Sequence, residues 1–309
     1  MAKPHKGMKI LAITPNGKHD YLASSILEGL KKYDIELYCT GKGNGDINNI
    51  TDIQFKEHYK TCDFIFAIWG KSIYNNVKEP DYYLIDEVDG WDKTVYIDGS
   101  EYNYTGFNGK TDLQLNPLFL NQAKYYFKRE CLPEHIRLGV LPLPFCSVDD
   151  DFKNLPTVEK DIDVLCAFGQ TDTGQRAISV QACEELKSEG YRIINHKVPN
   201  YNECMNRAKI TIDAHGGGEC NARAFQVMAN KSLLFMERYN IVIPNLIDTE
   251  HYVSWDNGDD LKNKIRKYLD NIDKIRILTN NSYDNVLNYH TSEKRVDYIL
   301  KIITNETRL

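Results

Sequence analysis

The segment His215–Phe235, HGGGECNARAFQVMANKSLLF, combines residue types that can bind an anion. Three glycines follow a run of β-type residues, and a segment with helical spacing follows the glycines. Glycine allows the backbone to approach a ligand where a side chain would prevent it. Arg223 lies between apolar residues of the helical segment, where a cation usually needs an anion beside it. We predict that His215 and Arg223 contact an anionic ligand; a salt bridge from Arg223 to a neighbouring carboxylate is the structural alternative.

A second glycine-containing turn, GQTDTGQR at Gly169–Arg176, directly follows the apolar run IDVLCAF. Gln175 stands where a P-loop needs lysine, and Arg176 where it needs serine or threonine, so this turn is not a P-loop. A turn that opens a helix still offers free N–H groups and the positive end of the helix dipole to a phosphate. Arg176 in the first turn adds a forked donor for phosphate oxygens. We predict a phosphate contact here; an ordinary βα turn with a surface arginine is the alternative.

Strands and helices must position these two turns, and the spacing of hydrophobic residues predicts where those strands and helices lie. Apolar runs alternate with segments of helical periodicity in each half of the chain, which favours parallel sheets joined by right-handed crossovers. Ligands of such sheets bind beyond the carboxyl ends of the strands, where both turns fall. The expected strands are MKILAIT, IELYCT, DFIFAIWG and KTVYIDG in the first half, and IDVLCAFG, YRIINH, ITIDAHG and SLLFMER in the second. Helices are expected near 22–30, 174–189, 202–208 and 221–229, and from 259 onward.

Chain length and a polar connector predict two domains. At 309 residues the chain is long for one domain and comfortable for two. The stretch CSVDDDFKNLPTVEK lacks periodicity and separates the two αβ series. We therefore predict an α/β fold of two Rossmann-like, doubly wound domains facing a cleft, with helices at the C-terminal end. The expected boundaries are residues 1–148 for the first domain, 149–160 for the linker and 161–309 for the second domain.

Composition narrows the class of protein. Hydrophobic residues make up 42% of the chain, enough to form real cores, and the net charge of −6 gives no global basic field for nucleic acid. The start MAKPHKGMKILAIT lacks the apolar core of a signal peptide, and no apolar run approaches the roughly 18–20 residues that cross a bilayer. The eight cysteines form no CxxC pair. We expect reduced thiols, a cytoplasmic protein and no membrane span.

The second half of the chain resembles a known family. NARAFQVMANKSLLFMERYN and the following HYVSWDNGDDLKNKIRKYLDNIDKIRILTNNSYDNVLNYHTSEKR are similar to the C-terminal domain of CgeB-like glycosyltransferases, a group with the GT-B fold. The resemblance covers about residues 160–305 and is faint over 1–120. The matching positions are Arg223, Phe225, Met228, Ala229, Leu233, Leu234, Asp260, Leu261, Ile265, Tyr268, Leu269, Asn271, His290, Thr291 and Arg295, with Arg176 at the arginine position of the first turn.

This resemblance implies a hexosyl- or pentosyltransferase that moves a sugar from a nucleotide-diphosphate sugar to an acceptor. The second domain would hold the donor and the first the acceptor, which would be a glycan or, alternatively, a nucleic acid or nucleobase. Arg176, Arg223 and the glycine-rich loops would stabilise the departing diphosphate without a metal or another cofactor. The residues expected to contact the donor are Gly169, Gln170, Thr171, Arg176, His215, Gly216, Gly217, Gly218, Glu219, Arg223 and Gln226.

The sequence departs from the family pattern at two positions. The family's glutamate, expected on the ribose of the nucleotide, is Gln226 here, and the usual glycine after the alanine is replaced by Asn230-Lys231. An amide can bond hydroxyl groups but carries no charge. These departures leave open a second function, a non-catalytic protein of GT-B fold that binds a sugar nucleotide or a glycan.

Catalysis requires a base only if the reaction inverts the anomeric centre, and the sequence leaves both stereochemical outcomes open. Asp98 in VYIDG and His19 in TPNGKHD follow strands of the first domain and are the candidates for such a base. The run Asp149–Asp151 resembles the metal-binding DxD motif of GT-A enzymes, but it opens the polar linker and is expected to form a solvated turn. We therefore expect no metal site.

Overall fold

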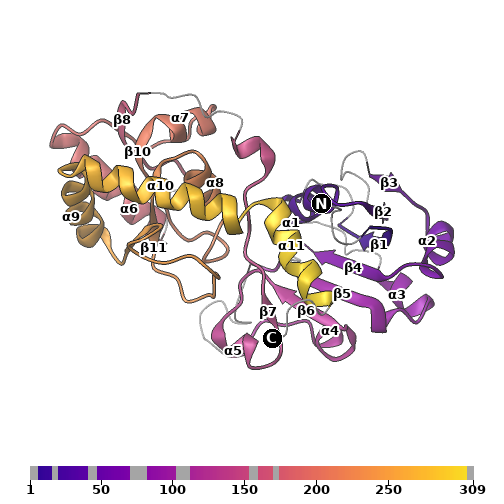
Figure 1. The fold of residues 1–309 in the computed structure, drawn as a ribbon. Coiled ribbons are helices and arrows are strands. Elements are labelled where there is room, and N and C mark those ends of the chain that lie inside the picture. The colour runs from indigo at the N-terminus through magenta and orange to yellow at the C-terminus, as the bar shows by residue number, and fades with distance from the viewer. Residues whose placement is uncertain are drawn as a thin grey trace. The chain divides into compact units, whose positions relative to one another are not determined.

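The computed structural model describes residues 6–15, 20–40, 47–69, 82–101, 112–152, 159–169 and 174–304. The chain forms two compact units (Figure 1). The first contains Met1–Pro144, Ile241–Ile243 and Ser292–Leu309, and the second contains Phe145–Asn240 and Pro244–Thr291. Each unit is built on a parallel sheet, which confirms the predicted α/β class with two Rossmann-like sheets.

The first unit is built on a seven-stranded sheet within the described residues. Its strands pair in parallel in the order β3 (Asn48–Asn49), β2 (Ile35–Cys39), β1 (Met8–Ile13), β4 (Phe64–Trp69), β5 (Thr94–Asp98), β6 (Tyr125–Lys128) and β7 (Leu141–Pro142). The helices of this unit are α1 (Tyr21–Leu30), α2 (Asp52–Tyr59), α3 (Tyr83–Glu87), α4 (Pro117–Gln122), α5 (Pro133–Ile136) and α11 (Ser292–Ile303), with a 3-10 turn, η2, at Trp91–Lys93.

The apolar runs of the first half form central strands because helices cover both faces of a parallel sheet, so every side chain of such a strand is buried. β5 is buried along its whole length, and so are the last four residues of β1. α1 begins at Asp20, whose side chain accepts a hydrogen bond from the Ala23 N–H at 2.9 Å. A side-chain cap of this kind satisfies one of the free N–H groups at the start of a helix.

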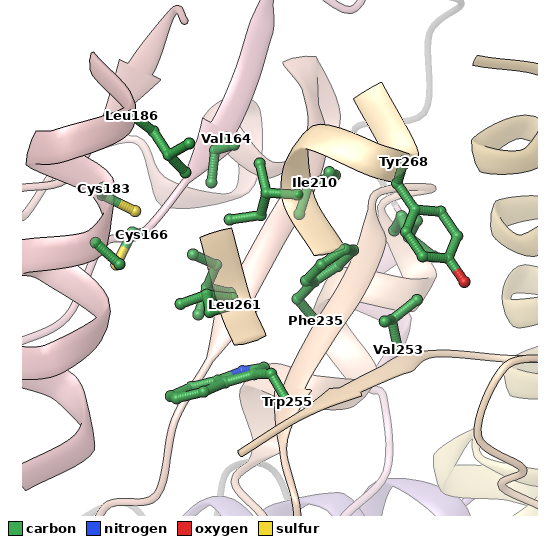
Figure 2. Close-up of a cluster of buried hydrophobic side chains, with 14 of the residues drawn as sticks. Val164, Cys166, Cys183, Leu186, Ile210, Phe235, Val253, Trp255, Leu261 and Tyr268 are labelled. Carbon is green, nitrogen blue, oxygen red and sulfur yellow. The ribbon is translucent and has the colours of Figure 1, made fainter. Parts of the chain in front are cut away.

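The second unit is built on a five-stranded parallel sheet within the described residues. Its strand order is β12 (Val253–Trp255), β11 (Leu233–Glu237), β10 (Ala208–Asp213), β8 (Ile162–Leu165) and β9 (Ile193–Ile194). The remaining elements are η3 (Asp149–Phe152), α6 (Gly174–Ser188), α7 (Tyr201–Arg207), α8 (Ala222–Ala229), α9 (Gly258–Leu269) and α10 (Ile272–Tyr289). Figure 2 shows part of the core, where Phe235, Trp255, Leu261 and Tyr268 gather beside the sheet.

The division of the chain differs from the predicted boundaries at its C-terminal end. Helix α11 belongs to the first unit and packs against α1, where a Cβ on Gly29 would lie 2.3 Å from the Ser292 carbonyl oxygen. The described start of the expected linker, residues 149–152, forms η3 and packs on α8 of the second unit. The amphipathic pattern of α11 predicts a buried face but does not say which sheet that face covers.

Candidate functional site

The described residues of both predicted turns lie at the carboxyl edge of the second sheet. β11, β10 and β8 are neighbours and run parallel, so their carboxyl ends meet at one edge. Phe168 and the exposed Gly169 follow β8, Asp213 ends β10, and Glu237 ends β11. This edge therefore brings together side chains from three strands and from the helices that follow them.

Arg223 in the first turn of α8 is held from three sides. Its Nη1 lies 3.2 Å from Asp213 Oδ1, and its guanidinium carbon lies 4.9 Å from the centre of the Phe168 ring and 5.6 Å from that of Tyr201. Burial raises the pKa of Asp213, while Arg223 and Arg176 favour its charged form. The Nε of Arg223 is buried and has no hydrogen-bond partner among the described residues. The predicted alternative, a salt bridge to a carboxylate, is therefore present, and it leaves a donor of the same guanidinium unused.

Arg176 approaches the same aromatic ring from α6. Its guanidinium carbon lies 5.5 Å from the centre of the Phe168 ring. A Cβ on Gly216 would lie only 2.4 Å from its Nη2, so the glycine lets backbone and guanidinium meet. None of Gly216, Gly217 and Gly218 has a positive φ, and the Gly216 N–H donates to the Gly218 carbonyl oxygen at 3.1 Å. Close approach, and not an unusual backbone conformation, is what requires glycine at position 216.

His215 and Glu237 form a hydrogen-bonded pair beside these arginines. The His215 backbone N–H donates to Glu237 Oε2 at 2.8 Å, and its Nδ1 lies 3.3 Å from Oε1 of the same carboxyl group. Burial raises the pKa of Glu237 to about 7, with Asp213 and Glu219 acting in the same direction. Burial lowers the pKa of His215. Glu219, also predicted to contact the donor, accepts a hydrogen bond from the Asn240 N–H.

Solved structures with a similar fold include glycosyltransferases. A glycosyltransferase from Rickettsia africae is 10% identical over 97% of this chain and 98% of its own, with a TM-score of 0.65. The Anabaena protein HepE, solved with UDP, is 10% identical over 96% of this chain and 100% of its own, with a TM-score of 0.63. An alpha-glucosyltransferase solved with UDP-glucose and DNA containing an abasic site has a TM-score of 0.60 at 10% identity, over 96% of this chain and 100% of its own. At these identities the likeness shows the fold, which is GT-B.

The activity class comes from a family comparison. Residues 182–301 match the family model described as glycosyl transferase-like. Together with the GT-B fold, this match supports glycosyltransferase activity. No curated protein matches its sequence. The matched range includes His215, Arg223 and Glu237, and it begins within α6 after Arg176. Among the residues that the structure describes, no helix combines the length and apolar character needed to cross a bilayer.

Gln226 binds an acidic residue that is far from it in the sequence. Its Nε2 donates to Asp151 Oδ1 at 3.1 Å, and Asp151 Oδ2 accepts from the Val148 N–H at 2.9 Å. Asn230 Nδ2 lies 3.3 Å from the Asp151 carbonyl oxygen and donates to the Gln226 carbonyl oxygen at 2.9 Å. The two departures from the CgeB-like pattern thus meet at one residue. A glutamate at position 226 would place two carboxylates together, whereas the amide supplies the donor that Asp151 accepts.

Asp98, one of the two predicted catalytic bases, lies in the first unit and is 2% exposed. Its Oδ2 accepts hydrogen bonds from the Tyr126 hydroxyl at 2.6 Å and from the Lys128 ammonium at 3.1 Å. Its Oδ1 accepts from the Ser100 N–H at 2.8 Å. Both carboxylate oxygens are therefore occupied, which is typical of a structural ion pair and leaves Asp98 poorly placed to accept a proton from a substrate. The other candidate base, His19, and the predicted donor contacts Gln170 and Thr171 lie outside the described residues.

Four residues of the site were absent from the sequence-based prediction: Phe168, Tyr201, Asp213 and Glu237. Asp213 and Glu237 are the last residues of their strands, so their position at the carboxyl edge was the signal that could have identified them. Tyr201 opens α7 and reaches Arg223 only through tertiary packing, for which the sequence holds no local signal. In the part of the chain that the structure describes, no group of three or more His, Cys, Asp or Glu side chains is arranged to hold a metal ion.

Proposed function

We propose that this glycosyltransferase moves a sugar from a uridine-diphosphate sugar to a hydroxyl group, and that Arg176 and Arg223 bind the diphosphate. The observation that carries the proposal is the convergence of both guanidinium groups on the Phe168 ring at the carboxyl edge of the second sheet. Two like charges repel each other, so this arrangement favours an anion beyond the one that Asp213 supplies. HepE was solved with UDP and also with UDP-glucose, which supports uridine as the base.

The proposed chemistry is metal-independent. Negative charge builds on the departing diphosphate in the transition state, and preorganised cations that face this charge lower the barrier. Arg223 is preorganised because the Phe168 and Tyr201 rings flank its guanidinium and Asp213 binds one edge. The arginines thus supply the positive charge that a divalent cation supplies in metal-dependent transferases.

We propose a glycan or another small hydroxyl compound as the acceptor. A nucleic-acid acceptor is the second candidate, because one similar structure was solved with DNA containing an abasic site. The net charge of −6 weighs against it, since an acidic protein repels the phosphate backbone. A cytoplasmic location fits the cysteines, because all eight are buried thiols in the structure.

A thermal-shift screen with UDP-, GDP-, ADP-, CMP- and dTDP-sugars in EDTA tests the donor. Saturation at 100-fold above Kd should stabilise the protein by about 2.7 kcal/mol, so the UDP-sugar should raise Tm by several degrees. Arg176→Ala should weaken UDP binding by about 10-fold or more, because the variant loses one charge-assisted hydrogen bond to the diphosphate. Arg276→Ala is the matched control, because the Arg276 side chain is 73% exposed on α10.

Turnover separates the enzyme from the binding protein. With the UDP-sugar alone, slow hydrolysis to UDP is expected from a transferase, and an acceptor should accelerate the release of UDP. Binding without any release of UDP, across a panel of acceptors, would favour the non-catalytic alternative. Binding of DNA that weakens steeply with salt would support the nucleic-acid acceptor.

A further inference from the structure

We propose that Glu237 is a positioning residue of this site, which holds the His215 ring so that its Nε2–H faces the diphosphate of the donor. The inference deepens the proposed function and rests on the donor site at the carboxyl edge of the second sheet. We expect the His215–Glu237 pair to take up one proton when a diphosphate binds. No sequence motif identifies Glu237, which is the last residue of β11.

The geometry places a carboxylate beside one nitrogen of the ring. Both oxygens of Glu237 face His215: Oε2 accepts the backbone N–H at 2.8 Å, and Oε1 lies 3.3 Å from Nδ1. A carboxylate that fixes one ring nitrogen of a histidine determines the role of the other nitrogen. The Nε2 of His215 is buried and has no hydrogen-bond partner among the described residues. The pair therefore leaves one nitrogen for a ligand.

The groups that face the pair come from several elements. Asp213 on β10 and Glu219 in the glycine-rich loop favour the protonated form of Glu237, whereas Arg176 on α6 and the His215 N–H favour its carboxylate. Glu219 also favours the charged form of His215. These charges oppose one another, and Glu237 is only 8% exposed. The pair therefore gains or loses one proton near neutral pH.

Diphosphate binding changes this balance. Above about pH 7 the empty site holds a Glu237 carboxylate and a neutral imidazole. A phosphate oxygen beside Nε2 favours the imidazolium, so the pair takes up one proton when the diphosphate binds. The ring then carries a proton on each nitrogen, with Nδ1–H facing the Glu237 carboxylate and Nε2–H facing the phosphate. During transfer, the bond from the anomeric carbon to the β-phosphate oxygen breaks and its electron pair stays on that oxygen. The Nε2–H donates a hydrogen bond to this charge, while the acceptor oxygen forms the new bond and releases its proton to water.

Calorimetry of UDP binding between pH 6.5 and 8.5, in two buffers of different ionisation enthalpy, measures the proton uptake directly. Uptake of one proton makes the affinity of the wild-type protein fall by up to about 10-fold per pH unit above 7. In Glu237→Gln the fall should be less than about 2-fold, because a neutral amide cannot stabilise the imidazolium at Nδ1 and burial then keeps the ring neutral. Ionisation of UDP itself, near pH 6, acts equally on every variant and cancels in the comparison.

Glu189→Gln is the matched control and should behave as the wild type. Glu189 lies on the surface beside Arg266, which lowers the pKa of the Glu189 carboxyl group, so that it stays ionised across this range. Folding of Glu237→Gln is checked by its Tm. Because the pKa of Glu237 is raised, its burial stabilises the fold at low pH and this stabilisation is lost as pH rises through about 7. The loss begins at the ordinary pKa of a glutamate, about 4.5, so the variant should match the wild type near pH 4 and exceed it at pH 8.5.

A measurement on the unaltered protein completes the test. The ¹⁵N signals of the His215 ring, assigned by their loss in His215→Asn, should show the proton on Nδ1 in free protein at pH 8 and on both nitrogens after UDP is added. A neutral ring with its proton on Nε2 in the UDP complex, or an unchanged pH dependence in Glu237→Gln, would overturn the role of Glu237. Absence of UDP binding by the wild-type protein at every pH would instead overturn the donor site itself.

Discussion

Replacing Arg223 by alanine should affect both stability and ligand binding, for two separable reasons. Asp213 is 1% exposed, and Arg223 is the cation that contacts it at 3.2 Å. Removing one partner of a buried pair costs about 3–5 kcal/mol. Arg176 also favours the Asp213 carboxylate, so the lower end of that range applies. A loss of about 3 kcal/mol corresponds to a decrease in Tm of about 6–12 °C for a domain of this size.

A double variant separates these effects. In Asp213→Asn/Arg223→Ala the buried carboxylate is absent, so most of the lost stability should return, by about 2 kcal/mol. Binding of UDP should stay at least about 10-fold weaker in both variants, because neither has the guanidinium that we propose binds phosphate. The deficit of the single variant should also shrink toward pH 5, since a protonated Asp213 needs no cation.

Thermal unfolding and UDP calorimetry on the wild type, both single variants and the double variant form a complete cycle. Equal Tm values for Arg223→Ala and the double variant would refute the claim that Arg223 balances Asp213. UDP affinity within 2-fold of the wild type in Arg223→Ala would remove Arg223 from the donor site, whatever its effect on stability.

Three further predictions follow from single contacts. Gly216→Ala should displace the Arg176 guanidinium and weaken UDP binding several-fold in calorimetry, and it should have no further effect in an Arg176→Ala background. Gln226→Glu should place two carboxylates together at Asp151 and lower Tm more at pH 8 than at pH 4, because two ionised carboxylates repel each other and acid relieves that repulsion. Asp98→Asn should lower the free energy of unfolding by about 3 kcal/mol, because it leaves a buried lysine without its carboxylate. A folded Asp98→Asn protein that binds UDP normally but transfers no sugar would instead support Asp98 as the base.

The alternation of strands and helices was predictable because buried strands and amphipathic helices have different spacings of apolar residues. A strand of a parallel sheet is covered on both faces, so β1, β4 and β5 read as continuous apolar runs. β12 escaped prediction because it is three residues long and Ser254 interrupts its apolar residues. Which unit a helix packs against depends on the tertiary path of the chain, so the sequence pattern placed residues 292–303 in the second domain, whereas α11 groups with the first unit.

Prediction of the site depended on where a side chain lies relative to its strand. The turns at Gly169 and Gly216 were found because glycines follow apolar runs at the ends of strands. Asp213 and Glu237 were not predicted as site residues. Each is a single polar residue at the end of an apolar strand, and such a residue also occurs where a strand simply enters a loop. The contact from Gln226 to Asp151 joins residues 75 positions apart, so the sequence alone could show the missing glutamate but not the partner that favours an amide.

The central claim is that the carboxyl edge of the second sheet binds the donor diphosphate through arginines. A crystal structure of the protein with UDP, grown in EDTA, tests it most directly. We expect phosphate oxygens within about 3.2 Å of guanidinium nitrogens of both Arg176 and Arg223. A diphosphate that contacts neither arginine, or that becomes ordered only when manganese is added, would contradict the claim.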